Sequence, residues 1–72
     1  MLNEKIVTDF IEILKDIMID FNLNQSQLAT RLGLKQSQIS EWLKGKSKPG
    51  YDNIKLICET LGVSADRLLG LE

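Results

Sequence analysis

A glycine separates two short helical patterns in residues 24–48, and this segment constrains the fold more than any other stretch of the chain. The first pattern covers about residues 25–32, where Asn24 and Gln27 have the spacing of a capping box that starts a helix. Gly33 is expected to end that helix, because a left-handed backbone angle costs glycine little. The segment therefore predicts a short helix, a tight turn and a second helix.

The second helix of this segment is expected over about residues 36–44, with Gly45 after it as a stop. Ala29, midway along the preceding helix, is small enough to let the second helix cross closely above it. The inward positions of the two helices and their turn share apolar character, and we expect them in the core: Leu28, Ala29, Leu32, Leu34, Ile39, Trp42 and Leu43.

Helical spacing of apolar residues predicts three further helices in the chain. They cover about residues 3–21, about residues 51–61, and a short stretch that Ser64 caps and that continues through Leu69. No strand-like alternation, internal repeat or linker is present, so we expect an all-α fold. A chain of 72 residues has room for one compact core, which predicts a single domain over residues 1–72.

The first helix has an apolar arc of about half its circumference, made by Leu2, Ile6, Val7, Phe10, Ile11, Ile13, Leu14, Ile17, Met18 and Phe21. Ile19 projects from its polar side. A deeply embedded helix with one exposed isoleucine accounts for this pattern, and a helix whose edge meets a partner subunit is the alternative. In the later helices, the apolar positions are Ile54, Ile57, Cys58, Leu61, Leu68, Leu69 and Leu71.

The composition weighs against an enzyme and against a metal site. Histidine is absent and Cys58 is the only cysteine, which removes the usual zinc constellations and histidine-based acid-base catalysis. No glycine-rich phosphate loop or nucleophile motif occurs, and no cofactor or small-molecule ligand is indicated. Acidic residues interrupt every apolar run, so neither a signal peptide nor a membrane span is expected, and we expect a cytoplasmic protein.

Positive charge is concentrated in the same segment as the two short helices. Residues 24–48 carry a net +4, from Arg31, Lys35, Lys44, Lys46 and Lys48 against Glu41, whereas the whole chain carries −1. The outer face of the helix over residues 36–44 holds glutamine and serine rather than the usual lysine and glutamate. Such a face is either merely solvated or forms hydrogen bonds to a partner, and the residues alone leave both interpretations open.

Several residues of this segment, and the end of the chain, together resemble a known family. Gln25, Ala29, Gly33, Ile39, Trp42, Gly45, Lys46 and Pro49, followed by LGVSADRLLG, resemble the phage repressor and Cro type of helix-turn-helix, also called the Xre family. The resemblance runs from Leu23 to Gly70 in residue type and spacing, and the first helix matches in pattern. It implies a compact five-helix, lambda-repressor-like domain, with a helix-turn-helix motif over about residues 25–44 that binds double-stranded DNA.

The resemblance also implies a function and a set of contacts. We expect a transcriptional regulator, a repressor in particular, that acts as a homodimer and places its third helix in the major groove of a pseudo-palindromic operator. Glutamine can pair with adenine through one donor and one acceptor. The residues expected to contact bases are Gln36, Ser37, Gln38 and Glu41. Those expected to contact the DNA backbone are Gln25, Lys35, Ser40, Lys44, Lys46 and Lys48.

Three features of the chain depart from the family pattern. Lys35 stands where serine or threonine commonly caps the third helix, and Gly50 stands where serine often caps the fourth. The isoelectric point of about 5.3 is low for a DNA-binding protein. The alternative function is therefore an antitoxin-like or other protein-interaction module with weak DNA binding.

Overall fold

The computed structural model describes the backbone of residues 2–71 and the side chains of residues 10–71. The described residues form five helices and no strands, as the periodicity predicts: α1 (Leu2–Asp20), α2 (Gln25–Leu32), α3 (Gln36–Leu43), α4 (Tyr51–Leu61) and α5 (Ala65–Leu68). The fold is therefore all-α. None of these helices is both long and apolar enough to cross a membrane.

The predicted helix ends are correct to within one residue, and four of them, in three helices, need correction. Helix α1 spans Leu2–Asp20 rather than residues 3–21, α3 ends before Lys44, and α5 ends before Leu69. Lys44 keeps nearly helical angles, with φ −89° and ψ −6°, but serves as the capping residue. Leu69, with φ −92° and ψ 2°, plays the same part at α5. A capping residue of this kind cannot be told from the last helical residue by apolar periodicity.

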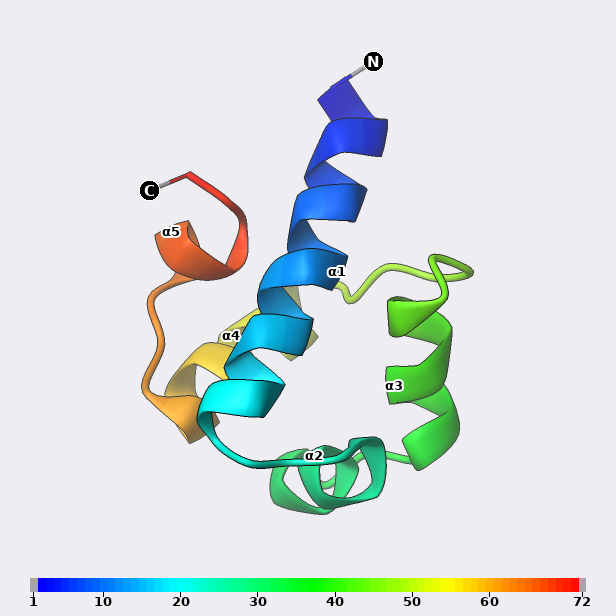
Figure 1. Cartoon of the computed structure of the whole chain (residues 1–72), viewed down its shortest axis with the longest axis vertical. Helices are drawn as coiled ribbons and strands as arrows, with labels where there is room; N and C mark the ends of the chain where they lie inside the picture. The colour runs from blue at the N-terminus through cyan, green and yellow to red at the C-terminus, as the bar shows by residue number, and fades with distance from the viewer. Residues whose placement is uncertain (1, 72) are drawn as a thin grey trace.

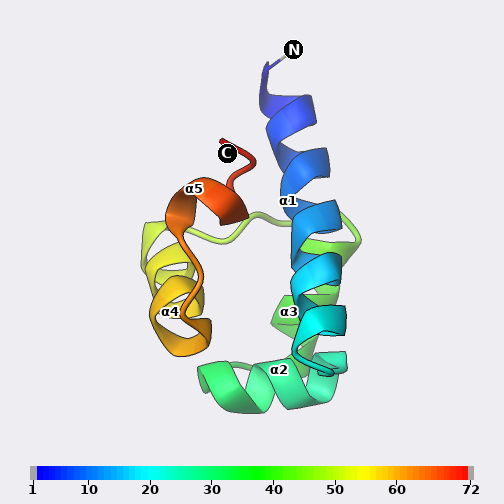
Figure 2. The ribbon, with the colours of Figure 1, turned by 60° about the vertical axis from the view of Figure 1, so that its left-hand side comes forward.

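The helices form a bundle around the carboxyl-terminal half of α1 (Figure 1). Helix α2 crosses beneath that end of α1 (Figure 2). Helix α3 lies on one side of α1, and α4 and α5 lie on the other (Figure 1). The amino-terminal turns of α1 project beyond the other helices (Figure 2). Helix α2 packs against α3 and α4, α1 packs against α3 and α5, and α4 packs against α5. The arrangement leaves one long side of α3 without a covering helix.

Every helix contributes at least one fully buried side chain to a single core, namely Leu14, Ile17, Leu28, Ile39, Ile57 and Leu68. Phe10 of α1 and Trp42 of α3 add an edge-to-face aromatic contact, with ring centroids 6.4 Å apart. Most of the residues predicted to face inward lie in or against this core. Leu71 instead lies beyond α5 and is 68% exposed, and the side chains of the predicted residues 2, 6 and 7 lie outside the described part.

The five helices end in one shared backbone arrangement. At α2, Gly33 is left-handed with φ 70°, and the Leu34 N–H donates to the Ala29 carbonyl at 2.9 Å. The same bond, from a residue to the carbonyl five positions earlier, follows the left-handed residues Asn22, Gly45, Gly62 and Gly70. This is the Schellman arrangement, in which a left-handed residue satisfies the last carbonyls of a helix. Asn22 is the only described residue other than glycine with positive φ.

The short helix α5 is fixed by two polar interactions. The Ser64 hydroxyl accepts a hydrogen bond from the Arg67 N–H at 3.0 Å and caps the helix, as predicted. The Arg67 guanidinium also pairs with the Asp20 carboxylate at 3.0 Å, which joins α5 to the end of α1. Both charged side chains are substantially exposed, so this ion pair orients α5 more than it stabilises the fold.

Candidate nucleic-acid interface

Helices α2 and α3 cross at a tight turn whose geometry is set by local hydrogen bonds. The Asn24 side chain accepts from the Gln27 N–H at 2.8 Å, and the Gln27 side chain accepts from the Asn24 N–H at 2.9 Å. This reciprocal pair is the predicted capping box, and it fixes where α2 begins. Ala29 is 3% exposed at the crossing, so its small side chain lets α3 approach α2 closely.

The amino end of α3 is capped by the Gln38 side chain rather than by the residue in the capping position. Lys35 occupies the capping position, and a lysine side chain has no hydrogen-bond acceptor. The Gln38 side-chain oxygen instead accepts from the Lys35 N–H at 3.1 Å. Gln38 is accordingly half-buried, and its acceptor oxygen is already engaged when the protein is free.

The exposed side of α3 presents three polar side chains, Gln36, Ser37 and Glu41, with Ser40 half-buried beside them and Lys44 exposed directly after the helix. The side chains of Gln36 and Ser37, in the first turn, form no hydrogen bond with any other described residue. Their donors and acceptors face solvent. The first turn of α3 thus offers hydrogen-bonding groups that a partner can use without breaking bonds inside the protein.

Unpaired cations lie at both ends of this face and in the loop after α3. Lys35 lies before the helix, Lys44 at its end, and Lys46 and Lys48 in the loop; all four are exposed. None of them forms an ion pair with a described residue, and the ion pair between Arg67 and Asp20 lies at α5 and α1. The four lysines can therefore neutralise a polyanion without giving up an internal partner.

Gln25 is the first residue of α2 and is half-buried. The family resemblance implies that it braces the first glutamine of α3, yet no hydrogen bond joins the described side chains of Gln25 and Gln36. Gln25 is nonetheless at the amino end of α2, where backbone N–H groups and the helix dipole favour an anion.

The titratable groups of the described residues include no cluster of metal ligands and one thiol with a raised pKa. Among the described residues, no cluster of three or more His, Cys, Asp or Glu side chains could hold a metal ion. Burial, and to a smaller degree the neighbouring Glu59 carboxylate, raises the pKa of the Cys58 thiol. The thiol therefore stays protonated near neutral pH and is a weak nucleophile.

Sequence patterns gave no indication of one feature next to this interface, an apolar pocket behind the loop that carries Lys46 and Lys48. Its walls come from α1, α3 and α4, from the loop, and from Leu69 directly after α5. No contiguous motif marks such a site, because its lining residues are brought together only by the packing of the helices. The inward-facing periodicity of Phe10 and Trp42 predicts burial, and it carries no signal for a pocket.

Comparison with known proteins places this segment in a family. A family model described as helix-turn-helix matches residues 14–68. The HTH-type transcriptional activator BcrR of Enterococcus faecalis is 36% identical over 64 residues. That match covers 89% of this chain and 31% of the relative, so the chain spans about a third of the relative's length. No solved structure matches significantly.

Proposed function

The chain belongs to the helix-turn-helix family, and we propose that it is a sequence-specific transcription regulator that binds double-stranded DNA through α3. The observation that carries the proposal is the exposed face of α3, where unengaged hydrogen-bonding groups lie between unpaired lysines. The major groove of DNA is about 12 Å wide and admits an α-helix. The family consists of regulators rather than enzymes, and binding is accordingly the activity proposed for residues 1–72 as one unit.

The base-contacting side chains proposed are those of the α3 face, Gln36, Ser37, Gln38 and Glu41. Gln36 is the strongest candidate, because its amide is free to pair bidentately with adenine. Gln38 would have to release the Lys35 N–H before its oxygen could do the same. Glu41 repels phosphate, so its favourable contact is with a cytosine amino group, which donates a hydrogen bond.

The backbone-contacting residues proposed surround that face: Gln25, Lys35, Ser40, Lys44, Lys46 and Lys48. The lysines do not distinguish one base from another. They neutralise phosphates and set the register of α3 in the groove. Ser40 and Gln25 are half-buried and would donate hydrogen bonds to phosphate oxygens from fixed positions. This division separates residues that recognise the base sequence from residues that supply affinity for DNA of any sequence.

A salt titration of binding to mixed-sequence DNA tests this function. Neutralisation of about four phosphates per subunit, one by each proposed lysine, gives a slope near −4 in a plot of log affinity against log salt. Fluorescence anisotropy of labelled duplex DNA at several sodium chloride concentrations measures that slope. A flat response would contradict the proposal and favour the alternative, an antitoxin-like protein-interaction module.

We also propose that the regulator is a homodimer on a pseudo-palindromic operator, with half-sites about 34 Å apart. One copy offers few phosphate contacts, and a second copy on the same site multiplies them. Tyr51 and Leu71, 79% and 68% exposed, are candidate interface residues, as is the edge of α1. Analytical ultracentrifugation with and without operator DNA checks this, and a monomer at high concentration in both cases would contradict it.

Two further parts of the proposal concern the effect on transcription and the location in the cell. A protein bound over a promoter blocks polymerase without contacting it, so repression is the proposed effect; the relative in Enterococcus faecalis is named an activator. Transcription in vitro from a template with the selected operator distinguishes the two, because repression lowers transcript yield as protein is added. Access to chromosomal DNA makes the cytoplasm the proposed location.

A further inference from the structure

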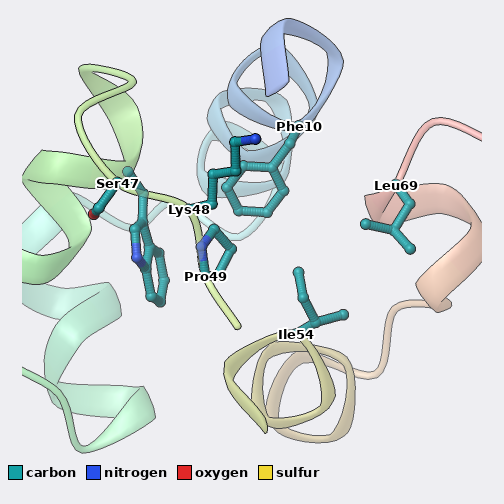
Figure 3. A pocket seen from close by; sticks show the side chains of 7 residues that line it. Phe10, Ser47, Lys48, Pro49, Ile54 and Leu69 are labelled. Atoms are coloured by element: carbon teal, nitrogen blue, oxygen red, sulfur yellow. The ribbon is translucent and has the colours of Figure 1, made fainter. Parts of the chain in front are cut away.

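A pocket of about 120 Å³ opens between four helices, behind the loop that follows α3 (Figure 3). Phe10 of α1 lies across the pocket from Ile54 of α4 and from Leu69, which directly follows α5 (Figure 3). Trp42 of α3 also lines the pocket. The loop closes the remaining side with Ser47, Lys48 and Pro49. Phe10 and Trp42 are almost fully buried, at 5% and 3% exposure, so these rings form an apolar inner wall.

The size and chemistry of this pocket restrict what it can hold. An apolar cavity of about 150 Å³ in a protein core stays dry and binds benzene, so a pocket of this size suits one ring or a branched chain of about five or six carbons. Lys48 is the one charged residue among the described lining side chains, and it is exposed. An anionic group at the rim would gain a charge-assisted hydrogen bond from its ammonium group.

We propose that this pocket is an effector site for a small apolar carboxylate, whose ring or branched chain lies against Phe10, Trp42, Ile54 and Leu69 and whose carboxylate pairs with Lys48. The inference concerns a ligand and a site separate from the exposed face of α3. Trp42 connects the two, because it comes from the buried side of the same helix.

The effect of such a ligand on DNA binding rests on the proposed function. Lys48 is a proposed phosphate contact, and a carboxylate paired with it removes one cation from the interface. DNA and ligand then compete for one side chain, so each weakens the binding of the other by the same factor. A coupling free energy between the two sites at the lower end of the range found in proteins corresponds to a roughly fivefold loss of DNA affinity at saturating ligand.

The probe is benzoate, titrated into the ¹⁵N-labelled full chain and followed by heteronuclear NMR. Trp42 is the only tryptophan, so a single indole N–H signal reports on the pocket. We expect this signal to shift and saturate with benzoate, less with benzyl alcohol and least with benzylamine, whereas the amide of Gln27 in α2 stays unchanged. No saturable shift with benzoate, or equal affinity for all three compounds, would overturn the proposal.

Variants separate filling of the pocket from damage to the fold. Leu69→Phe places a ring in the cavity and should abolish the benzoate-dependent shift, whereas Leu69→Met nearly conserves volume and should retain it. Dispersed NMR spectra and urea titrations establish that each variant folds. If Leu69→Phe unfolds, Ile54→Phe fills the pocket from α4 instead. Undiminished benzoate binding by a folded, filled variant would contradict the site. Lys48→Met should remove the preference for benzoate over benzyl alcohol.

The DNA arm uses the wild-type chain at constant ionic strength, with benzoate replacing chloride. Benzoate should weaken DNA binding about fivefold, and acetate, which has the charge without the ring, should leave it unchanged. An equal effect of acetate would overturn the coupling. If benzoate binds the free protein but DNA does not bind at all, the proposed function fails and the pocket stands. If DNA binds and the indole signal never moves, the pocket fails and the proposed function stands.

Discussion

At the residue scale, two glutamines with the same chemistry hold different positions in α3. Gln36 is exposed and unengaged, whereas Gln38 is half-buried with its oxygen bonded to the Lys35 N–H. Their spacing in the sequence suggests equal roles. The structure gives Gln38 a part in starting the helix, and it leaves Gln36 as the residue whose amide needs no rearrangement to meet a base edge.

The first prediction separates base recognition from backbone contact. Gln36→Ala should lose about 1–3 kcal/mol of discrimination at particular base pairs, because the bidentate adenine contact disappears. Lys46→Ala should weaken binding to all sequences about equally and reduce the salt slope by about one, because one phosphate contact is lost. Selection from random DNA followed by anisotropy measures both. Equal, non-selective losses from the two substitutions would contradict the assignment.

A second prediction concerns the structural role of Gln38. Gln38→Ala should lower the free energy of unfolding by about 0.5–1.5 kcal/mol, the usual net value of one hydrogen bond, because the Lys35 N–H loses its acceptor. Ser37→Ala is the matched control, since the exposed Ser37 hydroxyl bonds to no other described residue. Urea unfolding followed by circular dichroism measures both. A control loss as large as that of Gln38→Ala would argue against the capping role.

At the element scale, the lengths of the helices are set by their ends. A left-handed residue follows each helix, and the next N–H closes the last turn. The apolar residues Leu23, Leu34 and Val63 come directly after such positions and pack on the core. The stops after α1, α2 and α4 therefore do more than end a helix, because each also turns the chain so that the next side chain packs on the core.

The third prediction tests one of these stops. A Cβ added at Gly33 would meet nothing within 4 Å, so the cost of Gly33→Ala comes from the left-handed backbone at φ 70° alone. The free energy of unfolding should fall by about 1–2 kcal/mol. Gly50 is the control, because its added Cβ is also free of contacts and its φ is −76°.

For the Gly50→Ala control, the smaller entropy of the unfolded chain offsets the loss at the helix start, so the change should stay within about 0.5 kcal/mol. Chemical denaturation of the two variants side by side provides the measurement. A Gly33→Ala variant as stable as wild type would show that the left-handed angle at the end of α2 is not needed.

At the scale of the whole molecule, one core supports both the proposed interface and the pocket. The chain is small, and domains of this length have a total stability of roughly 4–11 kcal/mol. Ile57 of α4 has no exposed surface, whereas Ile19 of α1 is 76% exposed. These two isoleucines therefore measure what the core contributes.

The fourth prediction compares them. Ile57→Ala should cost about 2–5 kcal/mol, a large fraction of the total, because it removes a buried side chain and leaves a cavity. Ile19→Ala should change the free energy of unfolding by less than about 0.5 kcal/mol. Thermal and urea unfolding measure both. DNA affinity of the Ile57→Ala variant should fall in parallel with its folded fraction, and a stable Ile57→Ala variant would contradict the single-core description.

The sequence by itself determined the number and type of the helices, the caps of α2 and α5, and the glycine stops after α2 and α3. These depend on contacts between residues three to five positions apart, such as Asn24 with Gln27, and a linear pattern contains them. It also determined most of the inward side chains, because a helix repeats its faces every 3.6 residues. The ends of α3 and α5 differed by one residue, since their capping residues keep nearly helical angles.

Only the tertiary structure decided which polar groups are free and where a pocket lies. Arg67 pairs with Asp20 across 47 positions of sequence, and no local pattern distinguishes it from the unpaired Lys46 and Lys48. The pocket joins Phe10 and Leu69, which are brought together only because α1 packs against both α3 and α5. Contacts of this range depend on how the helices pack, and helix packing is not encoded in any single stretch of the chain.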